Sequence, residues 1–188
     1  RDGSLQWVPN FPKQSLKVPK HKVGYLYSSV SSLNPKTKQI ASGMQHFDRF
    51  DLVDVINNTV LTVVQEDKVE VKEVDLIDDH NLLPPETRSY YVRNYSTEKF
   101  IYLLYSNMTM QEGMEFYQGK RSDVPKPQLH VFDWKGNAVY KAVFDKVALG
   151  KFFLDEKTWT IYFRDGMPEN EEDIFVKYEL KGLRNLNR

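Results

Sequence analysis

The chain contains no cysteine, no long apolar run and no excess of either charge. Without cysteine it can form no disulfide, no thiolate zinc site and no cysteine nucleophile. No stretch approaches 18 uninterrupted apolar residues, which excludes a membrane-spanning helix of ordinary length in this sequence. The 26 Lys and Arg side chains are balanced by 26 Asp and Glu side chains. Proteins that bind nucleic acid through its phosphates normally carry a basic excess, so this function is disfavoured.

Helical periodicity is also scarce. No window of 12 or more residues carries a clear apolar stripe at helical spacing, whereas short apolar runs separated by turn residues are frequent, a pattern typical of all-β proteins. Aromatic residues make up 13% of the 188 residues, and such residues favour strands. The sequence therefore predicts an all-β protein, with residues 1–188 forming a single domain.

The clearest structural unit spans residues 88–144. It holds four apolar segments separated by turn residues, with strands predicted at residues 89–95, 100–105, 128–133 and 138–144. The second of these segments is apolar on both faces, which predicts a central strand covered on both sides. Residues 106–126 are expected to form a long polar loop. Residues 134–137 read as a tight hairpin turn, in which Gly136 and Asn137 suit a positive φ.

Two other units repeat this order of strands and turns. The C-terminal unit, residues 147–180, lacks an evident fourth strand, and a fainter unit spans residues 22–66. Their strands are predicted at residues 148–154, 158–163 and 174–180, and at residues 23–33, 39–44, 50–56 and 60–65. Repeated four-stranded units of about 40 to 60 residues are typical of β-propeller blades. A β-sandwich is the alternative fold.

Two segments carry a resemblance to a known family: Tyr91–Tyr105, YVRNYSTEKFIYLLY, and Val131–Asn137, VFDWKGN. They resemble the TolB-like six-bladed β-propeller proteins of Bacteroides-type bacteria, and the resemblance extends over about residues 22–180. It implies a propeller fold and a periplasmic or cell-surface location, including lipid anchoring through a segment absent from this sequence. It supplies no catalytic residues.

Only about three blades can be recognised in the sequence. The resemblance to six-bladed propellers implies that they are the C-terminal half of a ring. Three blades leave two blade faces uncovered, and each would present apolar side chains to water. We therefore expect a partner that covers these faces, either the missing N-terminal half of the propeller or a second copy of the chain. A protein or a glycan is the expected ligand.

The residues that usually carry metal chemistry form no recognisable pattern. No two of the four histidines stand at metal-ligand spacing, and no metal or other cofactor is expected. The acidic segment Asp75–His80 lacks the spacing of a calcium loop and is interpreted as a solvated loop. The basic stretch from Lys13 to Lys22 is interpreted as a flexible lead-in segment. Asp54 and Asp133 precede hairpin turns at equivalent places, which predicts a turn-stabilising role for both.

No nucleophile elbow, phosphate-binding loop or dinucleotide-binding motif is present, and the sequence identifies no catalytic residue. The leading hypothesis is a propeller-type binding or scaffold module of the bacterial envelope. The alternative is a propeller enzyme, a glycan hydrolase or lyase with its site in the central channel. Tyr117 and Trp134 are the candidate ligand-binding residues. The loops at residues 66–87 and 106–126 are expected to carry any binding surface.

Overall fold

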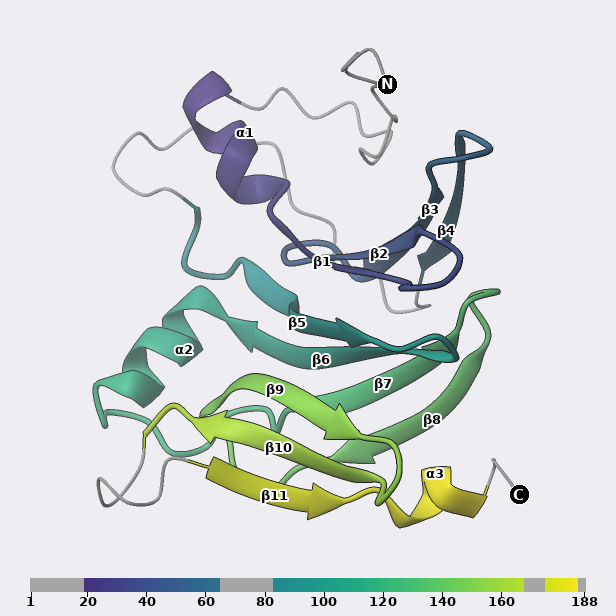
Figure 1. Ribbon diagram of the computed structural model, residues 1–188. Coiled ribbons are helices and arrows are strands. Elements are labelled where there is room, and N and C mark those ends of the chain that lie inside the picture. Colours follow the sequence, from purple (N-terminus) through teal and green to yellow (C-terminus); the bar gives the residue numbers. More distant parts are fainter. Residues whose placement is uncertain (1–18, 65–82, 168–174, 186–188) are drawn as a thin grey trace.

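The computed structural model describes residues 19–64, 83–167 and 175–185. These residues form three antiparallel sheets, and within each sheet the strands follow one another in chain order (Figure 1). The N-terminal sheet contains β1 (Ser29–Leu33), β2 (Gln39–Met44), β3 (Arg49–Asp54) and β4 (Thr59–Val64). The middle sheet contains β5 (Arg88–Ser96), β6 (Phe100–Thr109), β7 (Gln128–Asp133) and β8 (Ala138–Val143). The C-terminal sheet contains β9 (Leu149–Asp155), β10 (Thr160–Asp165) and β11 (Phe175–Glu179).

The three sheets are stacked as layers, with the middle sheet between the other two (Figure 1). The first strands lie closest together, because β1 contacts β5 and β5 contacts β9. Sheets that meet through their first strands and lie face to face have the arrangement of neighbouring propeller blades. The all-β propeller prediction is thus confirmed, and the two-layered β-sandwich is not observed.

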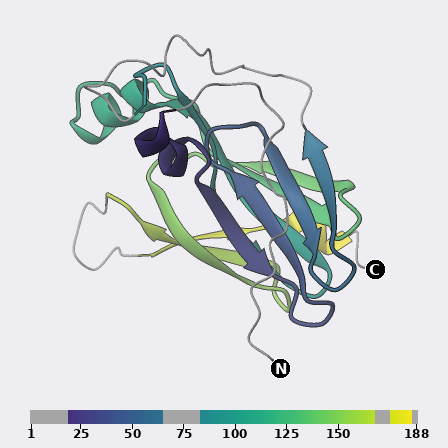
Figure 2. The same cartoon turned by 90° about the horizontal axis from the view of Figure 1, so that it is seen from above.

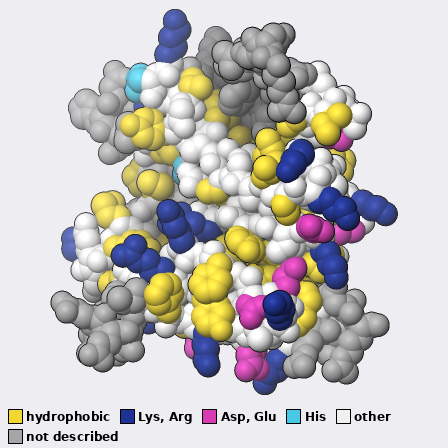
Figure 3. All heavy atoms as spheres, in the orientation of Figure 1, with side chains coloured by type: hydrophobic (Ala, Val, Ile, Leu, Met, Phe, Trp, Pro, Cys, Tyr) yellow, Lys and Arg dark blue, Asp and Glu magenta, His cyan; other side chains and the backbone are white. Residues whose placement is uncertain are grey.

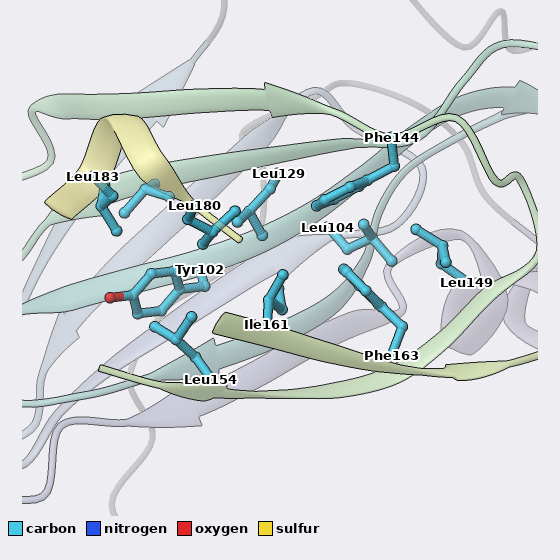
Figure 4. Close-up of a cluster of buried hydrophobic side chains, with 11 residues drawn as sticks. Tyr102, Leu104, Leu129, Phe144, Leu149, Leu154, Ile161, Phe163, Leu180 and Leu183 are labelled. Carbon is cyan, nitrogen blue, oxygen red and sulfur yellow. The ribbon is translucent and has the colours of Figure 1, made fainter. Parts of the chain in front are cut away.

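Strand β6 shows why the middle sheet needs a neighbour on each face. Ile101 and Leu103 are buried against the N-terminal sheet in a cluster that includes Phe50, whereas Tyr102 and Leu104 are buried on the opposite face. Figure 4 shows the second face, where side chains of the middle sheet point toward those of the C-terminal sheet. The prediction of a central strand covered on both sides is therefore confirmed.

The N-terminal and middle sheets approach closely where β2 passes β5. A Cβ atom on Gly43 would lie 2.9 Å from the Cβ atom of Tyr91, so only glycine fits between the two backbones. Beside this contact, the Asn94 side chain donates to the carbonyl oxygens of Val30 (3.2 Å) and Ala41 (2.9 Å). These bonds pair both amide hydrogens of the half-buried Asn94 side chain and fix the position of one blade on the next.

The two aspartates that precede hairpin turns stabilise those turns, as predicted. Oδ1 of Asp133 accepts hydrogen bonds from the amides of Lys135 and Asn137, both at 2.9 Å, and Oδ2 accepts from the Asn137 side chain. Asp54 makes the equivalent bonds with the two residues that follow Val55. Gly136 has the expected positive φ of 86°, whereas Asn137 is not among the positive-φ residues.

Three short helices differ from the sequence-based expectations: α1 (Lys20–Leu26), α2 (Met110–Tyr117) and α3 (Lys181–Asn185). The first replaces the start of the strand expected at residues 23–33. Leu26 is buried against Met44, Phe47 and Leu83, so tertiary packing favours a helix there. Lys22 lies in this helix and is 1% exposed, which contradicts its assignment to a flexible lead-in segment.

Helix α2 corrects the second expectation, because residues 106–126 are not a continuous polar loop. Strand β6 extends to Thr109, and the helix begins at the next residue. Both α1 and α2 lie at the same end of the stacked sheets, as Figures 1 and 2 show. None of the helices among the described residues is long and apolar enough to span a bilayer.

Candidate functional site

Helix α2 begins with a capping box. The Thr109 hydroxyl accepts a hydrogen bond from the Glu112 amide at 3.1 Å, and the Glu112 carboxylate accepts one from the Thr109 amide at 2.9 Å. These two bonds satisfy amides that a short helix would otherwise leave unpaired. They explain how eight residues that bury none of their side chains hold a helical conformation.

One face of α2 is apolar and solvent-accessible. Met110, Gly113, Met114 and Tyr117 follow one another at helical spacing and therefore share this face. Met110, Met114 and Tyr117 are 44%, 55% and 60% exposed, which is unusual for three large apolar side chains on one short helix. Such a face favours contact with an apolar ligand, because methionine side chains adapt to irregular shapes.

This face borders a cavity of about 430 Å³ between the middle and C-terminal sheets, which we call the α2 cavity. Its size falls within the range of small-molecule binding sites. The cavity is lined by Ser89, Val92, Arg93, Leu104, Ser106, Met108, Thr109, Met110, Gly113, Met114, Tyr117, Pro127, Val147 and Leu149. Most of these side chains are apolar, and Arg93 is the charged member of the set.

Arg93 lies on β5 opposite Leu104 and also lines a second hollow of about 310 Å³, which we call the basic hollow. Its Nη1 atom donates to the carbonyl oxygen of its neighbour Val92 at 2.6 Å. Its Nε atom is buried, and the described part of the chain offers it no hydrogen-bond partner. Arg93 therefore has donor capacity that the protein itself does not use.

A different polar cluster lies between the N-terminal and middle sheets, where the Tyr105 hydroxyl donates to Asp48 Oδ2 at 3.2 Å. Burial and, to a lesser extent, the charge of Asp48 raise the pKa of Tyr105, and the same two causes raise the pKa of Tyr90. A phenol with a raised pKa stays protonated and is a poor nucleophile. We therefore assign this cluster a structural role.

A further hollow, of about 500 Å³, lies between β4 and the outer strands of the middle sheet. Val63, Phe132 and Val139 are among its lining residues, and Lys141 is the charged one. None of the residues that line this hollow belongs to a helix, so an exposed apolar helical face like that of α2 is absent from its lining. It is therefore a weaker candidate for ligand binding than the α2 cavity.

The structure separates the two candidate ligand-binding residues. Tyr117 lies on the rim of the α2 cavity, where it can contact a bound molecule. Trp134 lies at the β7–β8 turn and donates from its indole nitrogen to the Thr97 carbonyl oxygen at 3.0 Å. It also packs against the buried cluster between the N-terminal and middle sheets. This geometry gives Trp134 a structural role at a turn, and ligand binding by either residue stays a prediction.

Within the described ranges, no three His, Asp or Glu side chains converge to form a possible metal site. The acidic segment Asp75–His80 and most of the loop at residues 66–87 lie outside these ranges. Sequence reasoning missed Arg93 and the helical face of α2. The capping-box pattern T-x-x-E at residues 109–112 was a usable signal for the helix.

A protein-family model described as TolB-like 6-blade propeller-like matches residues 3–157. The chain belongs to this family. The match extends from α1 through β9, so it includes both four-stranded sheets and the α2 cavity, whereas β10 and β11 lie beyond it. It confirms the resemblance to TolB-like propellers, although it begins and ends earlier than the expected residues 22–180. No curated protein and no solved structure matches the chain.

Proposed function

We propose that this TolB-like chain is a binding module that holds an apolar small molecule in the α2 cavity. The observation that carries the proposal is the exposed face formed by Met110, Gly113, Met114 and Tyr117 beside a cavity of about 430 Å³. Concave, mostly apolar sites with a few polar groups are typical of small-molecule binding sites. Tyr117, one of the two candidate ligand-binding residues, would then contact the ligand at the rim.

The residues of the cavity favour binding over glycan cleavage. A glycan hydrolase needs a pair of carboxyl groups beside the scissile bond. The lining of the α2 cavity contains no Asp, Glu or His among the described residues. A glycan hydrolase or lyase would therefore have to act elsewhere on the propeller, and the cavity supports the non-enzymatic hypothesis.

The proposed location is the periplasm or the cell surface of a Bacteroides-type bacterium. Membership of the TolB-like family supports an envelope location. Lipid anchoring through a segment outside this sequence is part of the same proposal. In that setting an apolar ligand would reach the α2 cavity from the solvent, because the apolar face of α2 is exposed.

The substitution Met114→Glu tests the cavity directly. Met114 is 55% exposed, so a carboxylate at this position should leave the fold intact. An apolar molecule bound in the cavity would, however, remove water from that carboxylate, which is unfavourable. We expect N-phenyl-1-naphthylamine, a neutral apolar dye, to bind the original protein, and Met114→Glu to weaken its affinity by about tenfold or more. Fluorescence titration measures both affinities.

The matched control is Gln111→Glu, which places the same charge on α2 outside the cavity lining. This control should bind the dye as the original protein does. Equal affinity of Met114→Glu and Gln111→Glu would show that the dye binds elsewhere and would contradict the proposal, as would an absence of dye binding by the original protein.

A second part of the proposal concerns the outer face of the C-terminal sheet. Phe153 and Phe175 are 49% and 65% exposed there, and Tyr162 stacks on Phe153 with ring centroids 4.9 Å apart. In Figure 3 hydrophobic side chains are interspersed with Lys and Arg over the lower half of the molecule, where this sheet lies. The family has six blades and the described residues form three sheets, so we assign this face to a further blade of the same ring.

In the absence of that blade, exposed aromatic side chains favour self-association. We expect light scattering to show concentration-dependent association of the chain alone, and the double substitution Phe153→Ser and Phe175→Ser to reduce it. A stable monomer up to about 100 μM would contradict this part of the proposal, because association through a patch of this kind is expected at micromolar concentrations. A discrete dimer would instead identify a second copy as the occupant.

A further inference from the structure

We infer that the ligand of the α2 cavity is an amphipathic anion whose negative group binds Arg93. This inference rests on the proposed function, because it assigns a charge to the molecule that the cavity holds. Arg93 is the residue shared by the α2 cavity and the basic hollow. A molecule with its apolar part beside α2 can therefore place a charged end at the Arg93 side chain.

The bonding of Arg93 supports a ligand role for its guanidinium. In the described residues its hydrogen bond goes to the Val92 carbonyl oxygen, and no carboxylate forms an ion pair with it. Its Nε atom is buried and has no hydrogen-bond partner in the part of the chain that the structure describes. An unpaired buried donor on a cationic group is unfavourable, and a carboxylate or phosphate oxygen would relieve this cost.

The residues around the basic hollow add to its positive charge. Lys151 and Arg164 line the hollow together with Arg93. Asp165 also borders it, but Lys146 already forms an ion pair with the carboxylate of this residue. Three cationic residues and one neutralised carboxylate leave a positive excess, which favours an anion over a neutral polar group.

Two features of the site favour a single negative charge on an extended apolar body. Both β6 and α2 contribute apolar side chains to the lining. The apolar part of the ligand should therefore be larger than its charged group. The guanidinium fork of arginine matches the two oxygens of a carboxylate. The chemical class is therefore a medium-chain or long-chain monocarboxylate, or an aromatic carboxylate of similar size.

A pair of probes of equal carbon number, one anionic and one neutral, tests this inference. Decanoate and 1-decanol each contain ten carbons, and each can be measured by displacement of N-phenyl-1-naphthylamine. We expect decanoate to bind about tenfold more tightly than 1-decanol at low salt, since charge-assisted hydrogen bonds are stronger than neutral ones. The advantage should shrink as sodium chloride screens the partly exposed guanidinium.

The substitution Arg93→Gln should remove the preference for decanoate over 1-decanol, whereas Arg93→Lys should retain part of this preference. Arg121→Gln is the matched control, because Arg121 pairs with Glu115 outside the cavity lining. Circular dichroism checks that each variant is folded.

The outcomes separate this inference from the proposed function. Equal binding of decanoate and 1-decanol by the original protein would overturn the anion inference and leave the apolar cavity standing. A preference that persists in Arg93→Gln would also overturn it. If neither the dye nor either probe binds, the proposed function itself fails.

Discussion

Replacement of Phe163 by alanine is expected to lower the free energy of unfolding by about 3–5 kcal/mol. Phe163 is fully buried between the middle and C-terminal sheets (Figure 4). Its ring lies 4.9 Å from that of Phe144 and 5.2 Å from that of Phe152, measured between centroids. Alanine would remove these contacts and leave a cavity that the two sheets cannot fill without moving closer together. Urea denaturation followed by tryptophan fluorescence measures the loss.

The matched control is Phe153→Ala, on the neighbouring strand of the same sheet but on its outer face. Because Phe153 is 49% exposed, its removal should cost less than about 1 kcal/mol, measured at a protein concentration at which self-association is absent. A loss of similar size for both variants would contradict the assignment of Phe163 to the core between blades. Such a result would mean that the C-terminal sheet does not pack on the middle sheet in solution.

The strands could be predicted from sequence because their signals are local. Residues 128–133 were expected as one strand, and β7 occupies the same residues. The apolar pattern of Phe100–Tyr105 indicated burial on both faces, and the neighbouring sheets on each side of β6 confirm it. The aspartates before the hairpin turns also act locally, through bonds to the next few residues.

The helices were missed because they are short. Helices α1 and α2 contain seven and eight residues, fewer than the window of 12 in which an apolar stripe was sought. Helix α1 depends on the burial of Leu26 against Phe47 and Leu83, which sequence spacing does not reveal. For α2 the capping box was visible, but the apolar face beside it was taken as part of a polar loop.

The candidate site could be predicted only in part. Tyr117 was a candidate ligand-binding residue within the expected loop at residues 106–126, and it does lie on the cavity rim. The role of Arg93 could not be predicted from sequence, because a single arginine in a strand does not indicate a binding site unless its neighbours in space are known. Those neighbours include Leu104, Val147 and Gly150, which only the packing of two blades brings together. The structure instead places Trp134 at the β7–β8 turn, where its indole nitrogen donates to a turn of another hairpin, and its ligand-binding role stays a prediction.

The second large effect concerns pH and His130. This side chain is 5% exposed, and its ring stacks on that of Tyr105 at a centroid distance of 4.6 Å. Burial and, to a lesser extent, the charge of Lys141 lower the pKa of His130 to about 4. In the unfolded chain a histidine has a pKa near 6.5, so between these values the unfolded state binds more protons than the folded state.

The protein should therefore lose stability as the pH falls from about 6.5 toward 4. Between pH 7.5 and pH 5.0 the contribution of His130 to this loss is expected to be about 2 kcal/mol. Urea denaturation of the original protein and of His130→Gln at both pH values measures it. The variant should be less stable than the original at pH 7.5, but its stability should change less with pH.

Other titratable groups also contribute to the pH dependence, and the comparison separates them from His130. Burial also lowers the pKa of His46, but His46 is present in both proteins, so its contribution cancels in the difference. The turn residue Asp54 has a lowered pKa through hydrogen bonds from Asn57, and its effect falls at a pH below about 4. His21→Gln, at an exposed position on α1, should retain the pH dependence of the original protein. If His130→Gln also retains the pH dependence of the original protein, the loss of stability at low pH does not come from protonation of His130.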